Sequence, residues 1–266
     1  MKKIIPFLII LLVGCTPKQQ LLILCSNDSH SQIEAKNNLG GFAARADLVD
    51  SLRKLYPLNL LLDAGDMVQG TPYFNFYSGR IEMEGYNRIG YDAVTLGNHE
   101  FDMGLDTLAM FLKIANFPVV SCNYDVRGTL LEGLVKPYVV FERGGMKIAV
   151  IGFGISPKSL ILPTNFDPIK YLDPIERGNF YADSLKNAGC DFVIALSHLG
   201  LENSVNDSVL AAKSRNIDLI LGGHTHSIKG EELKGEFEFK NMDNKPVKLV
   251  KTSSKGLQMD KVIVEF

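Results

Sequence analysis

Several residue types are missing or rare in this sequence, and each absence excludes a class of protein. The 266 residues include no tryptophan, four cysteines and five histidines. The 28 lysines and arginines do not exceed the 30 aspartates and glutamates, which argues against a nucleic acid polymer as partner. No group of cysteines has zinc-finger spacing, so a closed structural zinc site is not expected. Without a repeat, a low-complexity tract or a Pro- or Ser-rich linker, the chain reads as one mixed α/β domain over residues 21–266.

The amino end has an apolar run that is too short to span a membrane. IIPFLIILLVG (Ile4–Gly14) follows the basic start MKK, as in a secretory signal, whereas a membrane-spanning helix needs about 20 residues. The run ends in LVGC, which resembles the bacterial lipoprotein signal, in which the cysteine is acylated after cleavage. We therefore expect a signal peptide over residues 1–15, a lipidated Cys15 that reaches a membrane, and a tether over residues 16–20. The protein would then be an exported lipoprotein of the cell envelope; the alternative is a plain signal peptide cleaved nearby.

The remaining cysteines do not indicate a disulfide framework or a nucleophile. Cys25, Cys122 and Cys190 are an odd number and cannot all pair within one chain. Cys25 and Cys122 lie in apolar runs, where a small thiol packs well. One bridge between them is the alternative, but we expect free buried thiols.

Short apolar segments bounded by turn residues predict the strands. They are residues 21–28, 58–66, 91–100, 117–125, 147–154, 190–198 and 217–226. Amphipathic stretches such as 40–55 and 176–190 lie between them, and this alternation predicts largely parallel sheets covered by helices. Residues 137–153 read as a hairpin turning at Gly144 and Gly145. The closing residues 248–266 alternate more and look antiparallel.

Polar side chains gather where these apolar segments end. All five histidines occupy such positions, together with two aspartates and one asparagine: Asp28, His30, Asp66, Asn98, His99, His198, His224 and His226. The carboxyl ends of parallel strands face one crevice, where α/β proteins place their sites. A single histidine at a strand end is usually structural, but five of five indicate a shared task.

The chemistry of this set favours divalent ions and a phosphate. Imidazoles with carboxylates and a carboxamide oxygen suit zinc, manganese or iron(II). One ion cannot use seven such ligands, whereas two ions sharing a bridging carboxylate can. Two ions and two aspartates leave about two positive charges, which complement a phosphate dianion, and two-metal sites clamp both oxygens in phosphoryl transfer.

Five motifs in a fixed order resemble a known family. NDSH, DAGDMVQGT, GNHEFDMG, LSH and GGHTH are similar to the motifs of calcineurin-like metallophosphoesterases, and the second and third resemble the 5′-nucleotidase branch. The resemblance covers residues 21–266. It implies a four-layer α/β/β/α sandwich of two mixed sheets with a dimetal site at the strand ends.

The resemblance also assigns roles to individual residues. One metal would take Asp28, His30, Asp66 and His226, and the other would share Asp66 and take Asn98, His198 and His224. Some family members have glutamine at the position of His226. His99 and Asp102 match the catalytic dyad, although Asp102 could instead cap the following helix. Glu100 lies in the motif without a role that the sequence explains, and Asn123 is a candidate phosphate contact.

The expected function is dimetal-dependent hydrolysis of a small phosphate ester, with a metal-activated water attacking phosphorus and His99 assisting. Alternatives on the same site are a 2′,3′-cyclic nucleotide phosphodiesterase, a nucleotide-sugar hydrolase and a sulfur-ester hydrolase. A different class is a non-catalytic lipoprotein that captures metal. Nucleotidases of this branch usually add a carboxyl-terminal domain whose aromatics clamp the base. The sequence stops at Phe266, so we expect little base preference, with either a partner chain supplying the clamp or a substrate that is not a nucleotide.

Overall fold

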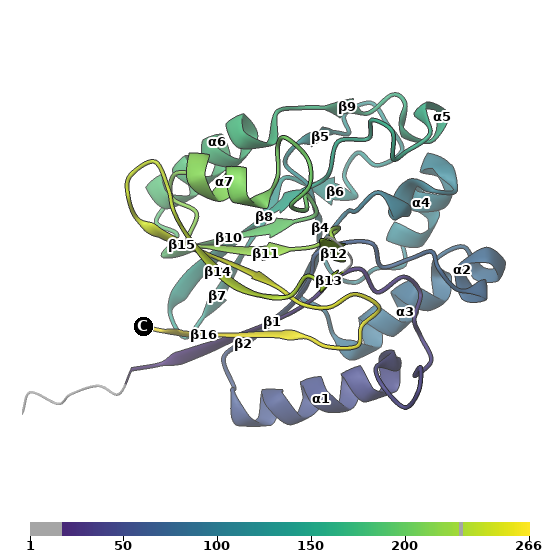
Figure 1. Ribbon diagram of the computed structural model, residues 1–266, viewed down its shortest axis with the longest axis horizontal. Coiled ribbons are helices and arrows are strands. Elements are labelled where there is room, and N and C mark those ends of the chain that lie inside the picture. The colour runs from purple at the N-terminus through teal and green to yellow at the C-terminus, as the bar shows by residue number, and fades with distance from the viewer. Residues whose placement is uncertain (1–17, 229–230) are drawn as a thin grey trace, which may run out of the picture.

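Two six-stranded mixed sheets pack face to face in a computed structural model that describes residues 18–228 and 231–266 (Figure 1). The expected signal peptide, Cys15 and the first residues of the tether lie outside these ranges. Each sheet alternates its side chains between two faces, and helices cover the faces turned away from the other sheet. The predicted four-layer α/β/β/α sandwich is confirmed.

The first sheet has a parallel centre with one antiparallel edge. Its order is β16-β1-β2-β3-β4-β6. Only β16 runs antiparallel, pairing Gln20 of β1 with Glu265. The strands are β1 (Gln20–Ser26), β2 (Asn59–Asp63), β3 (Ala93–Thr95), β4 (Val119–Val120), β6 (Val135–Lys136) and β16 (Asp260–Glu265).

The second sheet has a parallel centre and two antiparallel edges. Its order is β14-β15-β11-β10-β8-β7, and the edge strands β14 and β7 run antiparallel to their neighbours. The strands are β7 (Tyr138–Arg143), β8 (Met146–Phe153), β10 (Phe192–Ser197), β11 (Leu219–Gly222), β14 (Gly235–Lys240) and β15 (Pro246–Lys251). The β7–β8 hairpin confirms the predicted turn at Gly144 and Gly145.

Three apolar cores hold the layers together. Alternate residues of β1 separate two of them, because Leu22 and Leu24 face the helices whereas Leu21 and Ile23 face the second sheet. The third core lies under the helices of the second sheet and includes Ile151 of β8. These runs are apolar on both faces because both faces are covered.

The helices divide between the outer layers, and short elements fill the loops. The first sheet packs against α1 (Gly41–Leu55), α3 (Arg80–Ile89) and α4 (Gly104–Leu112), and the second against α6 (Pro174–Asn187) and α7 (Asp207–Lys213). Asp173 caps α6 by accepting from the N–H groups of Ile175 and Glu176. The short elements are α2 (Pro72–Tyr77), η1 (His99–Phe101), α5 (Pro163–Phe166), β5 (Tyr124–Asp125), β9 (Lys170–Tyr171), β12 (Ser227–Ile228) and β13 (Glu231–Glu232).

The closing segment corrects one expectation from the sequence. β16 is antiparallel to β1 and β15 is antiparallel to β14 as predicted, but β15 also runs parallel to β11 and belongs to the other sheet. The loop between them crosses from one sheet to the other, which alternation within the sequence could not reveal.

Two further features bear on the expectations about cysteines and the membrane. Cys25, Cys122 and Cys190 are buried free thiols, as expected. Among residues 18–228 and 231–266, no helix combines the length and apolar character needed to cross a bilayer.

Candidate metal centre

The candidate site lies where the parallel strands of both sheets end. The loop after β1 carries Asp28 and His30, the loop after β2 carries Asp66, and Asn98 and His99 follow β3. From the second sheet, His198 follows β10, while His224 and His226 follow β11. Backbone hydrogen bonds join the first two loops, because the N–H of His30 donates to the carbonyl of Asp66 at 3.0 Å. All eight side chains that the sequence singled out at strand ends therefore belong to one edge of the sandwich.

Four of the candidate ligands have a left-handed backbone conformation. The φ angles are 49° at Asp28, 46° at His30, 55° at Asp66 and 67° at His224. This region is unfavourable for residues other than glycine, and strain of this kind concentrates at functional sites. The strand ends therefore turn sharply to aim these side chains into the crevice.

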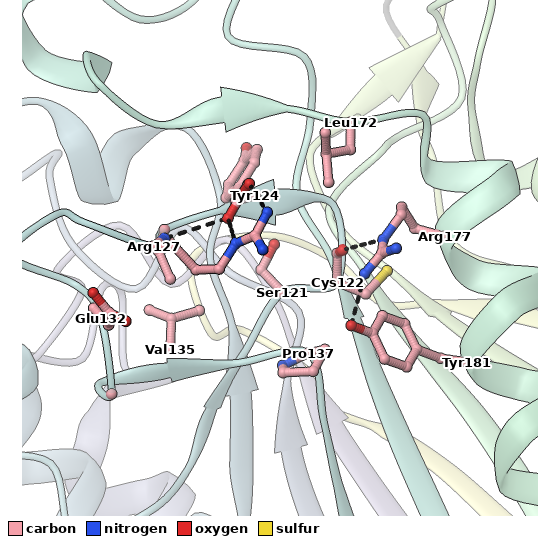
Figure 2. Close-up of a pocket in the computed structure, with 13 residues that line it drawn as sticks. Ser121, Cys122, Tyr124, Arg127, Glu132, Val135, Pro137, Leu172, Arg177 and Tyr181 are labelled. Atoms are coloured by element: carbon pink, nitrogen blue, oxygen red, sulfur yellow. Dashed lines mark hydrogen bonds and ion pairs between the residues drawn. The ribbon is translucent and has the colours of Figure 1, made fainter.

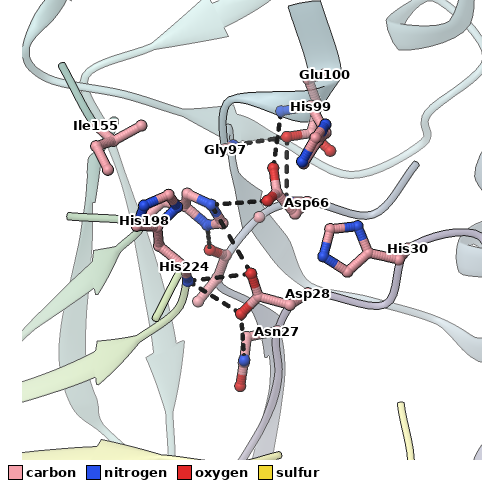
Figure 3. A network of polar contacts seen from close by, with 12 residues as sticks. Asn27, Asp28, His30, Asp66, Gly97, His99, Glu100, Ile155, His198 and His224 are labelled. Atoms are coloured by element: carbon pink, nitrogen blue, oxygen red, sulfur yellow. Dashed lines mark hydrogen bonds and ion pairs between the residues drawn. The ribbon is translucent and has the colours of Figure 1, made fainter. Parts of the chain in front are cut away.

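The side chains form two metal-sized clusters that match the expected division. Asp28, His30 and His226 offer ligand atoms within 4.8 Å of one another, and Asp66, His198 and His224 form a second such group. Figure 3 shows Asp66 and His198 in contact, with His30 and Asp28 nearby. His30, Asp66 and His99 also satisfy the 4.8 Å limit, so His99 lies beside the cluster of ligands.

Unpaired buried atoms are evidence that the ligand set fits metal ions. The Nδ1 atom of His198 contacts the carbonyl of Ala64 at 2.6 Å, which leaves Nε2 free to coordinate. Oδ1 of Asn98 is buried without a hydrogen-bond partner among the described residues, and the carboxylate oxygen closest to Nε2 of His198 is Oδ2 of Asp66, at 3.1 Å and without good hydrogen-bond geometry. Such atoms are costly unless something binds them, and both belong to the expected second metal's ligands.

The charges of the cluster suit cations. Burial alone would raise the pKa of Asp28, but the hydrogen bond from His226 and the charge of Lys251 bring it far below its usual range. Burial likewise opposes the charge of Asp66, yet His198 lowers its pKa to about 2. Burial lowers the pKa of His224 to about 4 with help from the charge of His198, and burial also lowers the pKa of His30. Burial lowers the pKa of His198, but Asp66 and Asp28 outweigh burial and raise it to about 10. The centre therefore offers two carboxylates and the neutral imidazoles of His30 and His224, whereas His198 would release its proton to a bound ion.

His99 pairs with Asp102 at the rim of the centre. Its Nδ1 atom lies 2.8 Å from Oδ2 of Asp102. Burial lowers the pKa of His99, but the bond to Asp102 and the charge of Asp66 outweigh burial and raise it to about 9. Asp102 does not cap α4, whose N-cap is Met103 without a side-chain hydrogen bond. The capping alternative is therefore wrong, and Nε2 of His99 is available to a substrate.

Glu100 has a role that the sequence did not reveal. Its buried carboxylate accepts the N–H groups of Asp66 at 3.1 Å, Met67 at 2.7 Å and Gly97 at 2.6 Å. These bonds tie the loop after β2 to the loop after β3, and so fix the proposed bridging aspartate. The sequence placed Glu100 in the motif, but two of its three partners, Asp66 and Met67, lie more than 30 residues away.

Asn123 does not face a substrate in this structure. Its fully buried amide donates to the carbonyl of Gly154 at 2.7 Å and accepts from the Gly154 N–H at 2.8 Å. It thus joins the loop after β4 to the loop after β8, across the two sheets. The expected phosphate contact is corrected to a structural contact.

A separate cavity of about 360 Å³ does not belong to the centre. It is lined by Ser121, Tyr124, Arg127, Arg177 and Tyr181, among others, and none of the candidate ligands (Figure 2). Its guanidinium groups already have partners, since Arg127 binds Asp125 and Arg177 binds the carbonyl of Cys122 and the hydroxyl of Tyr181.

The fold and the clustered ligands define a metallophosphoesterase, and comparison with known proteins identifies the family. The family model of the calcineurin-like phosphoesterases matches residues 21–227. The chain belongs to this family and is homologous to the amino-terminal part of 5′-nucleotidases.

Relatives and solved structures agree on this placement. The snake venom 5′-nucleotidase of Gloydius brevicauda is 36% identical over 223 residues, covering 78% of this chain and 37% of that protein. The 5′-nucleotidase of Bos taurus is 32% identical, and the match covers 93% of this chain and 46% of that protein. The structure of the Haemophilus influenzae NAD nucleotidase superposes with a TM-score of 0.85 and 31% identity. The superposition covers 94% of this chain and 48% of that chain. The chain therefore spans about half the length of these relatives, or less.

Proposed function

We propose that this protein is a dimetal-dependent phosphomonoesterase that resembles 5′-nucleotidases in its chemistry. The observation that supports this proposal most directly is the pair of clusters, Asp28–His30–His226 and Asp66–His198–His224, with the His99–Asp102 pair beside them. Asp66 would bridge the two ions and Asn98 would complete the second set. When bound, the ions would neutralise phosphate charge and supply an attacking water of lowered pKa.

The dyad would handle charge and protons on the substrate. With a pKa of about 9, His99 carries a proton at neutral pH, so its Nε2–H can donate to a phosphoryl oxygen or to the leaving oxygen. Asp102 holds the Nδ1 side of the ring and thereby fixes its orientation. The N–H of His99 donates to Oδ1 of Asp66 at 2.9 Å, which couples the dyad to the proposed bridge.

The leaving group has room beside the second cluster. A cavity of about 570 Å³ has His224 in its wall, and the rest of its lining is mostly polar, including Ser159, Tyr171 and Asn203. Hydroxyl and amide groups of this kind can bind the hydroxyl groups of a ribose or another sugar. This supports a sugar phosphate or a nucleotide as substrate.

The proposal is tested by hydrolysis of an aryl phosphate with controlled metal content. We expect chelation of the purified chain to abolish turnover, and manganese, cobalt or zinc to restore it. A bis-aryl phosphate diester serves as comparison, and we expect it to be the poorer substrate. Full activity in strong chelator, after metal analysis confirms removal, would overturn the proposal.

A metal-capturing lipoprotein without catalysis is the competing function. It would use the same seven ligands but would need no histidine–carboxylate pair at the rim. The 2.8 Å contact between His99 and Asp102 therefore favours the enzyme. Tight metal binding combined with no turnover of any phosphate ester would instead favour metal capture.

Two parts of the proposal concern the surroundings of the enzyme. We propose that Cys15 is lipidated and holds the protein on the outside of a membrane, and that a separate chain can supply a nucleotide-binding domain. Incorporation of labelled palmitate that is lost in Cys15→Ser tests the first part. Co-purification of a partner that lowers the KM for AMP tests the second.

A further inference from the structure

A buried lysine lies next to the candidate metal centre. Lys251 ends β15 and is 1% exposed. Its Nζ atom lies 3.7 Å from Oδ2 of Asp28 and has no hydrogen-bond partner among the described residues. Removing an ammonium from water is costly unless an opposite charge compensates. Because burying this ammonium costs free energy, its position beside Asp28 indicates a function that involves that carboxylate.

The two carboxylate oxygens of Asp28 have different nearest side chains. Oδ1 lies 3.1 Å from Nε2 of His226, within the first ligand cluster, whereas Oδ2 is the oxygen nearest to Lys251. The carboxylate is fully buried and has few other partners, chiefly the N–H of His224 and the amide of Asn27. A bound ion and the lysine would therefore act on the same charge from two sides.

The charge of Lys251 also acts on two further carboxyl groups, one buried and one half-buried. They are Asp207, in the first turn of α7, and Asp260, at the start of β16. Burial raises the pKa of both carboxyls to about 7. The charge of Lys251 lowers both pKa values, and the hydroxyl of Ser197 also lowers that of Asp207. The Oδ2 atoms of both residues lack hydrogen-bond partners in the described part of the chain. Lys251 is thus the buried cation common to three carboxyl groups.

We propose that Lys251 is a resident counter-cation of the metal centre, which balances Asp28 when the centre is empty and competes with a bound ion when it is full. The inference rests on the metal centre of the proposed function. It makes Lys251 a positioning residue, because it acts through Asp28 and does not touch substrate.

The two effects of Lys251 have opposite signs. Without its charge, Asp28 and Asp66 would share a buried site with less compensation, so the metal-free fold should be less stable. Without the charge of Lys251, a bound ion would no longer be repelled by the ammonium and would attract Asp28 without competition, so metal should bind more tightly. A lysine that only fills space would instead lower stability equally with and without metal.

Lys251→Met tests the inference, because methionine keeps an unbranched apolar side chain and removes the charge. Lys248→Met is the matched control, since Lys248 is on the same strand and pairs with Glu236 at 2.8 Å, away from the centre. We would measure the Kd for Mn²⁺ by calorimetry on the metal-depleted chain, and the Tm with chelator and with saturating Mn²⁺. We expect Lys251→Met to bind Mn²⁺ at least tenfold more tightly and to lose several degrees of Tm only without metal. The control should keep the Kd of the unaltered chain.

Several results would overturn the inference. One is an unchanged or weaker Mn²⁺ affinity of Lys251→Met, and another is an equal loss of Tm with and without metal. Lys251→Arg keeps the charge and should stay within threefold of the original Kd; a tenfold shift would show that charge is not the cause. If Lys251→Met folds only with Mn²⁺ and unfolds on chelation, that supports the counter-cation role. Failure of the unaltered chain to bind Mn²⁺ would overturn the metal centre, and this inference with it.

Discussion

At the scale of single residues, His99 and Asp66 are in contact but should respond differently to substitution. The N–H of His99 donates to Asp66, yet only Asp66 belongs to the cluster with His198 and His224. We expect His99→Ala to keep about two metals per chain and to lower kcat about 100-fold or more, because it removes a donor used in the transition state. Asp66→Asn should lose metal. Metal analysis and kcat for both variants check this, and identical behaviour would contradict the division of roles.

Single residues also show where prediction from sequence succeeded and where it stopped. The clustering of the candidate ligands was predictable because each follows an apolar strand, and parallel strands end at one edge. Glu100 was not, because its role consists of hydrogen bonds to Asp66 and Met67 on another loop. Asn123 was misplaced for the same reason, since only the packed sheets bring Gly154 to its amide. The position of Lys251 beside Asp28 was not predictable, because no motif near Lys251 in the sequence indicates this contact.

At the scale of elements, the loop between β3 and η1 passes so close to the candidate ligands that position 97 cannot carry a side chain. A Cβ atom at Gly97 would collide with Oδ1 of Asp66 and would lie 2.6 Å from Nε2 of His198. We therefore expect Gly97→Ala to weaken Mn²⁺ binding at least tenfold, measured by calorimetry. Gly128→Ala is the control, because its Cβ would meet nothing within 4 Å, although its φ of 72° makes it strained. Equal metal affinities in the two variants would contradict this reading of the loop.

The layer formed by β1, β2, α1 and α3 contains a buried carboxyl that should make stability depend on pH. Asp63 accepts from Ser26 at 2.6 Å and Tyr86 at 2.9 Å. Burial raises its pKa to about 7, against the opposing effects of Ser26 and Arg45. A carboxyl whose pKa rises on folding stabilises the fold below its unfolded value of about 4, and that contribution is lost as pH rises through 7.

We therefore expect the metal-free chain to lose stability between pH 5 and pH 8, and Asp63→Asn to reduce this loss. One pKa unit corresponds to about 1.4 kcal/mol, so Asp63 can contribute at most about 4 kcal/mol to the change. Urea midpoints at the two pH values in chelator provide the measurement, with the exposed Asp50→Asn as control. A variant with the same pH dependence as the original chain would count against Asp63.

At the scale of the whole molecule, the 266-residue chain should show little preference among bases. Most of its aromatic side chains are buried in the cores or pack against them, and stacking on an aromatic is worth about 1–3 kcal/mol. We expect similar kcat/KM values for AMP, GMP, CMP and ribose 5-phosphate, with a high KM for AMP. Phe76 and Tyr77 of α2 are 80% and 50% exposed, and Phe180 of α6 is 58% exposed. A strong base preference that Phe76→Ala abolishes would contradict the prediction and place a clamp on α2.

The fold class was predictable because strands and helices alternate and the motifs implied a two-sheet sandwich, but the assignment of the closing strands to different sheets was not. The β15 and β16 segments are close in sequence, yet they pair with β11 in one sheet and β1 in the other. Only the packing of the two sheets decides this pairing, since either segment has the apolar alternation of an edge or inner strand.

The direction of β1 has a consequence for where substrates come from. The strand begins at Gln20, beside the carboxyl end, because the N–H of Gln19 donates to the carbonyl of Phe266 at 3.0 Å (Figure 1). It then runs seven residues, or about 23 Å, toward the metal-binding edge. Any surface that held the amino end would therefore have the catalytic crevice on the far side, open to the surrounding solution. With the proposed membrane attachment, such an orientation would suit the capture of water-soluble esters and would turn the crevice away from the lipid headgroups.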